Sequence, residues 1–138
     1  MPRELPDTVR LRVSTRAQWH CQYCLFPEAR SAFPHQVDHI VSRKDGGSSG
    51  LDNLALCCIF CNRYKGSDIA AIDIRTGGIV RLFHPRLDQW SDHFRISGAI
   101  IEPFTPQGEV TARLLRFNQA ERVVERALLQ TRGYYPHQ

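Results

Sequence analysis

Residues 36–65 read QVDHIVSRKDGGSSGLDNLALCCIFCNRYK, and they carry the pattern from which the fold is predicted. Residues 36–41 and 54–57 are typical of two short strands. The polar residues 42–53 between them contain a Gly-Gly pair and predict a loop. A helix is expected from near Phe60 to about Ala71. The predicted order is therefore strand, loop, strand, helix.

Four of the five cysteines form two C-x2-C pairs, Cys21/Cys24 and Cys58/Cys61, with 33 residues between them. In a reducing compartment, clustered cysteines indicate metal ligands before disulfides. Two such pairs are the usual way to build a tetrahedral Zn²⁺ site, and four cysteines leave no open coordination position. We therefore expect a structural zinc, with four buried free thiols as the alternative. Cys57 is expected to be a core thiol, although it could replace Cys58 as a ligand.

The ordered pattern C-x2-C…V-D-H-I…G-G…N-L…C-x2-C-N-x2-K, over residues 21–65, resembles the HNH endonuclease family. The resemblance implies a ββα-metal core that hydrolyses DNA phosphodiester bonds. It assigns His39 the role of general base, and Asn53 the role of holding the loop and orienting that base. It assigns Asp38 and Asn62 to a catalytic metal ion. Because Asn62 stands where the last histidine of the signature would be, the chain resembles an H-N-N variant.

The same residues suit phosphodiester hydrolysis on chemical grounds. The reaction needs an activated water, a cation on the scissile phosphate and help for the leaving oxygen. A histidine titrates near neutral pH and makes a good base. The carboxylate of Asp38 and the amide oxygen of Asn62 suit Mg²⁺ or Mn²⁺. Adjacent strand residues face opposite sides, so the strand must end or twist at Asp38 and His39 if both enter one site.

Three further residues, Lys65, Arg63 and His35, are candidates for phosphate contact. Two other functions stay open beside the endonuclease. One is a nucleic-acid-binding zinc module that has lost catalysis, and the other is a nuclease subunit that is active only within a complex.

The whole chain is expected to have an α+β fold. Residues 1–72 would form the HNH core, with zinc knuckles and an N-terminal helix over residues 7–19. Residues 73–138 would form a β-rich extension that ends in a helix and packs on the core as part of a single domain. Phe83, Trp90 and Phe94 are expected to make that packing contact.

Within the extension, residues 79–83, 94–96 and 99–104 favour strands, and Gln107-Gly108 favours a turn. The last helix has Asn118 as its expected N-cap, with Glu121 in the capping-box position. Val124 and Leu128 would form its apolar stripe, and Gly133 would end it.

Composition indicates a polyanionic partner. The net charge is +4 and the sequence pI is about 9.0. Only Lys44 and Lys65 are lysines, whereas 16 residues are arginines, whose planar donor fork suits phosphate oxygens. We expect DNA to be bound with little or no sequence specificity. No apolar run reaches membrane-spanning length and residues 1–6 lack the apolar core of a signal peptide, so we expect a cytoplasmic protein without membrane contact.

Overall fold

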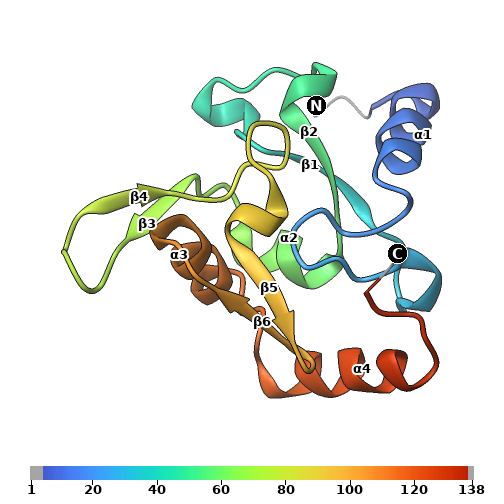
Figure 1. Ribbon diagram of the computed structural model, residues 1–138. Coiled ribbons are helices and arrows are strands. Elements are labelled where there is room, and N and C mark those ends of the chain that lie inside the picture. The colour runs from blue at the N-terminus through green and yellow to red at the C-terminus, as the bar shows by residue number, and fades with distance from the viewer. Residues whose placement is uncertain (1–4, 137–138) are drawn as a thin grey trace.

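The computed structural model describes residues 5–136 and has an α+β fold (Figure 1). Its N-terminal half contains α1 (Asp7–Arg16), β1 (Gln36–His39), β2 (Leu54–Cys57) and α2 (Ile59–Lys65). Strands β1 and β2 pair antiparallel, and α2 follows β2 directly. The predicted order of strand, loop, strand and helix is confirmed.

Helix α2 is shorter than the sequence predicts. It begins after Cys58, whose sulfur accepts a hydrogen bond from the backbone N–H of Cys61. It ends before Gly66, which has a φ of 54° that residues with a side chain rarely adopt. Ala71, expected near the helix end, lies instead in strand β3 (Ala70–Ile72), which pairs with β4 (Ile79–Arg81). The predicted boundary between the core and the extension, at residue 72, therefore falls inside the β3–β4 hairpin.

The extension also holds the β5–β6 hairpin (Phe94–Ser97 and Ile100–Pro103), helix α3 (Pro106–Leu114) and helix α4 (Ala120–Thr131). The expected turn at Gln107-Gly108 is wrong, because these residues lie in the first turn of α3. Pro106 occupies a first-turn position, where its missing N–H costs nothing. The Thr105 side chain caps the helix by accepting from the backbone N–H of Gly108.

Helix α4 is present as predicted, but its expected cap and apolar stripe are wrong. Val124 and Leu128 are 58% and 61% exposed, and the buried side chains of the helix are Arg122 and Arg126. Asn118 does not cap it, because its side chain bonds to β6 and to Arg126. In Figure 1, α4 runs along the edge of the molecule below the β5–β6 hairpin.

The main hydrophobic core joins the two halves of the chain. It contains the knuckle cysteines together with Phe83 and Phe94, whose rings lie 5.6 Å apart. The indole N–H of Trp90 donates to the carbonyl oxygen of Tyr23 at 2.8 Å. The predicted packing role of these three aromatic residues is confirmed. Among residues 5–136, no helix is both long and apolar enough to cross a membrane.

Candidate metal centre and catalytic site

The four predicted ligand cysteines lie together. The sulfurs of Cys21, Cys24, Cys58 and Cys61 are buried and all lie within 4.8 Å of one another. A tetrahedral site with Zn–S bonds of about 2.3 Å has sulfurs about 3.8 Å apart, and those of Cys24 and Cys58 are 3.7 Å apart. In each knuckle the backbone N–H of the second cysteine donates to the sulfur of the first. This geometry fits a zinc site.

Four buried thiolates would require a cation among them. Burial raises the pKa of the Cys21 and Cys61 thiols well above the ordinary value, so a cluster of four thiolates needs positive charge beside it. Cys57 stays outside the cluster, and its thiol contacts the carbonyl oxygen of Cys58. It is a buried core residue, and Cys58 is the residue that joins the cluster.

The first knuckle is also bonded to the hairpin. The backbone N–H of Gln22 donates to the carbonyl oxygen of Leu56, and the Gln22 side-chain oxygen accepts from the N–H of Leu56. These bonds fasten the N-terminal turn to β2, and the cysteine cluster joins the same turn to the start of α2.

Asp38 points into the protein. It is 6% exposed, and its Oδ2 accepts from the Tyr23 hydroxyl at 3.0 Å and lies 3.2 Å from the Lys65 ammonium. Burial raises the pKa of Asp38 above its ordinary value, although the Lys65 charge acts in the opposite direction. The Asp38–Lys65 ion pair links β1 to the last residue of α2.

Lys65 is 2% exposed and also donates to the carbonyl oxygen of Ile40 at 3.0 Å. Its ammonium is thus engaged inside the protein, contrary to the expectation that it contacts phosphate. His35 is likewise buried, and its Nε2 donates to the carbonyl oxygen of Phe26 at 2.8 Å. Of the three expected phosphate contacts, Arg63 is the exposed one.

His39 is the last residue of β1, so the strand ends two residues before the predicted end at residue 41. Its Nε2 lies 3.0 Å from the Ser49 hydroxyl and 3.3 Å from Nε of Arg43. Burial, together with the Arg43 charge, lowers the pKa of His39 below its ordinary value. The imidazole is therefore neutral at neutral pH.

Asn53 holds the loop that follows His39. Its side-chain oxygen accepts from the N–H of Val41 at 2.9 Å, and its amide nitrogen donates to the carbonyl oxygens of Val41 at 2.9 Å and Ser48 at 2.7 Å. Its own carbonyl oxygen accepts from the N–H of Ile40. These bonds tie both ends of the loop to one buried side chain.

Gly47 completes this loop, because no other residue fits there. A Cβ at this position would lie 1.8 Å from the carbonyl oxygen of Val41 and 2.8 Å from the Asn53 amide nitrogen. The second glycine of the Gly-Gly pair therefore serves a close approach of two backbone segments beside the Asn53 bonds.

Asn62 directly follows Cys61, and its amide nitrogen donates to the side-chain oxygen of Gln36. Asn62 and Lys65 are three residues apart and share one face of α2. Gln36 and Asp38 share the face of β1 that this helix covers. Asp38 and Asn62 thus belong to the same strand–helix interface, whereas the His39 ring contacts Arg43 and Ser49 in the loop that follows β1.

Five residues with a direct contact to this site were missed by the sequence reasoning. They are Tyr23, Gln36, Arg43, Ser49 and Arg122. Spacing could have indicated Gln36, two residues before Asp38 on a strand, but nothing in the sequence connects Tyr23, inside the first C-x2-C pair, with Asp38. Nothing in the sequence connects Arg122 with cysteines about 60 residues away.

Comparison with known proteins gives one match. Residues 21–68 match the family model described as HNH endonuclease, which covers all the cysteines of the cluster together with Asp38, His39, Asn53 and Asn62. No curated protein and no solved structure matched the chain.

Proposed function

We propose that this chain, whose residues 21–68 form an HNH endonuclease domain, is a metal-dependent enzyme that hydrolyses DNA phosphodiester bonds. The domain supports a nuclease-type function in general. The observation that carries the finer proposal is the placement of His39. It ends β1 beside the loop held by Asn53, and its lowered pKa keeps the ring in the basic form.

His39 is proposed as the general base. A guanidinium can only donate hydrogen bonds, so the Arg43 contact makes Nε2 the acceptor and leaves the proton of the neutral ring on Nδ1. The Nε2 lone pair is proposed to accept a proton from the attacking water once that water displaces the Arg43 N–H and the Ser49 hydroxyl from it. Until then, these two contacts hold the ring in one orientation.

Asp38 and Asn62 are the residues proposed to hold Mg²⁺ or Mn²⁺. When bound, such an ion would offset charge on the phosphate and stabilise the leaving oxygen. A carboxylate and a neutral amide oxygen, completed by water and phosphate, suit these ions. Because Lys65 and Tyr23 both contact Oδ2 of Asp38, the other carboxylate oxygen is the one left for the ion.

DNA is the proposed substrate. The chain carries a net charge of +4, and arginines supply most of its positive charge. Arg43 and Arg63 are exposed residues of the loop after β1 and of α2. Contacts from arginines to the phosphate backbone give affinity without sequence preference, so weakly specific cleavage is expected.

One observation favours a second candidate, a nucleic-acid-binding module without catalysis. The Asp38 carboxylate already has a full positive charge beside it, supplied by Lys65. If this ion pair takes the place of a metal ion, the domain would keep its fold and its affinity for nucleic acid but would not cleave.

Incubation of the purified protein with supercoiled plasmid and Mg²⁺ or Mn²⁺ separates the two candidates. We expect the wild-type protein to convert the plasmid to open or linear forms. His39→Ala should lose about 100-fold or more of this rate, the usual contribution of a general base. His93→Ala is the matched control, since that ring bonds to Thr105 in the extension and should leave cleavage unchanged.

Equal cleavage by His39→Ala and wild type would refute His39 as the base. A wild-type protein that retards DNA in a gel but cleaves it with neither metal would overturn the enzymatic proposal in favour of the binding module.

A further inference from the structure

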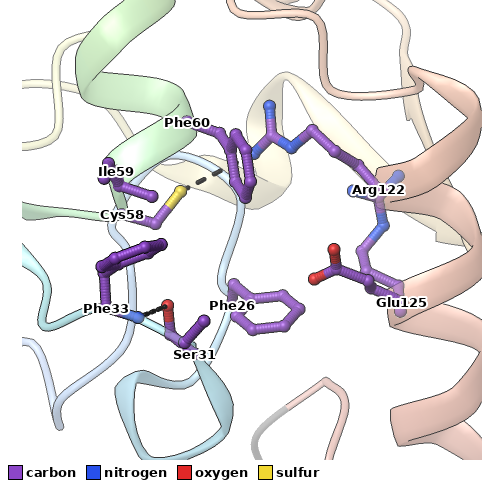
Figure 2. Close-up of a pocket in the computed structure, with 10 residues that line it drawn as sticks. Phe26, Ser31, Phe33, Cys58, Ile59, Phe60, Arg122 and Glu125 are labelled. Atoms are coloured by element: carbon purple, nitrogen blue, oxygen red, sulfur yellow. Dashed lines mark hydrogen bonds between the residues drawn. The ribbon is translucent and has the colours of Figure 1, made fainter.

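Arg122 of α4 reaches the cysteine cluster from the far end of the chain. Its NH2 nitrogen lies 3.1 Å from the sulfur of Cys61 and 3.7 Å from that of Cys58. Figure 2 shows this side chain extending from the helix past Phe60, with a dashed line to the Cys58 sulfur. Arg122 is itself buried, so these contacts are shielded from water.

The remaining surroundings of Arg122 orient its guanidinium toward the sulfurs. NH1 donates to the carbonyl oxygens of Leu115 and Arg116 at 2.7 and 3.2 Å. The guanidinium also lies 5.7 Å from the ring centre of Phe60. Among residues 5–136, none of the ion pairs with a carboxylate involves Arg122. The anionic partner of this buried cation is therefore the sulfur cluster.

Charge balance gives this contact its role. A zinc ion with four thiolates carries a net charge of about −2, and a buried charge without compensation is costly. Hydrogen bonds between charged groups are stronger than neutral ones. A guanidinium that contacts two of the sulfurs offsets part of this charge and thereby favours retention of the metal.

We propose that Arg122 is a positioning and charge-compensating residue of the zinc site, so that the C-terminal extension helps to retain the metal. The proposal concerns the zinc site alone and holds whether or not the chain cleaves DNA. If Arg122 only supported packing, its substitution would change stability alone. In the proposed role, its substitution also changes the retention of zinc.

Arg126 provides a matched control. It is buried on the same helix, one turn further on, and donates to the carbonyl oxygen of Ala99 and to the side chain of Asn118. None of these hydrogen bonds involves sulfur. Substitution of Arg126 also removes a buried arginine from α4 but leaves the hydrogen bonds to the cluster in place.

The test uses the full-length, zinc-loaded protein and measures the rate of zinc transfer to a chromogenic chelator. Loss of a residue that supports metal ligands typically costs about 10–100-fold in metal affinity. Arg122→Gln should therefore release zinc about 10–100-fold faster than wild type, and Arg126→Gln should release it at nearly the wild-type rate. In the cobalt-substituted protein, the sulfur-to-metal absorption band should shift in Arg122→Gln and not in Arg126→Gln.

If Arg122→Gln does not fold, the pair Arg122→Lys and Arg126→Lys carries the same test. A lysine ammonium lacks the planar fork by which NH2 contacts the sulfurs while NH1 bonds to backbone carbonyl oxygens, so Arg122→Lys should release zinc faster than both wild type and Arg126→Lys. Equal release rates for the two members of either pair, or an unchanged cobalt spectrum in Arg122→Gln or Arg122→Lys, would overturn the proposal.

Discussion

Replacement of Lys65 by methionine would leave the Asp38 carboxylate buried without its cation. The two side chains are 2% and 6% exposed, and their charged atoms are 3.2 Å apart. Methionine keeps most of the apolar volume of lysine and removes the ammonium. The bond to the carbonyl oxygen of Ile40 is lost with it.

Removal of one partner from a buried ion pair typically costs about 3–5 kcal/mol, because the remaining charge stays uncompensated. We expect Lys65→Met to lower the free energy of unfolding by this amount at neutral pH. Burial already raises the pKa of Asp38, and loss of the Lys65 charge raises it further. Only the charged carboxylate is destabilised by the loss of Lys65. The loss in the free energy of unfolding should therefore be largest at a pH well above the pKa of Asp38, and it should decrease as the pH falls and Asp38 is protonated.

Urea unfolding of the zinc-saturated protein, followed by circular dichroism, measures this effect. Asp38→Asn, Lys65→Met and the double variant form a double-mutant cycle. The double variant should be less destabilised than the sum of the two single variants, since it leaves no unpaired charge. A loss below about 1 kcal/mol in Lys65→Met, in the range of exposed pairs, or strictly additive losses, would refute the description of this pair as a coupled buried ion pair.

Three further predictions concern the loop, the base and the zinc. Gly47→Ala places a Cβ 1.8 Å from the carbonyl oxygen of Val41, and the resulting shift of the loop should reduce plasmid cleavage about 100-fold with zinc content unchanged. Because the pKa of His39 is lowered, the pH profile of the cleavage rate should have an apparent pKa below 6.5. The rate should reach its maximum above this pKa and fall as the pH decreases through it. An apparent pKa above 6.5 would contradict this. Cys61→Ser should lose zinc, measured by atomic absorption, and also cleavage, since Asn62 is the next residue; normal cleavage by zinc-free protein would contradict the link.

The elements around the candidate site could be predicted because their signals are local. The two C-x2-C pairs, the polar loop and the two short strands all lie within residues 21–65. Asn53 was expected to hold the loop, and its three side-chain hydrogen bonds do so. The predicted strands 36–41 and 54–57 agree with β1 and β2 to within two residues.

The partners of the site residues could not be predicted in the same way. Lys65 reads as an exposed helical lysine near the site, yet it is buried because the same face of α2 covers Asp38. Tyr23 reads as a residue of a zinc knuckle, yet its hydroxyl reaches a carboxylate on β1. Each contact joins elements that lie far apart in the sequence, and no periodic pattern records such a pairing.

Helix α4 forms where the local sequence predicts it, but its buried face differs from the predicted one. The residues between Gln119 and Gly133 determine that a helix forms there. Helical periodicity also indicates Val124 and Leu128 as the buried face, but the structure buries Arg122 and Arg126 instead. The physical reason is the surface on which the helix packs. That surface carries cysteine sulfurs and backbone carbonyl oxygens. These acceptors form strong hydrogen bonds with guanidinium groups and none with aliphatic side chains.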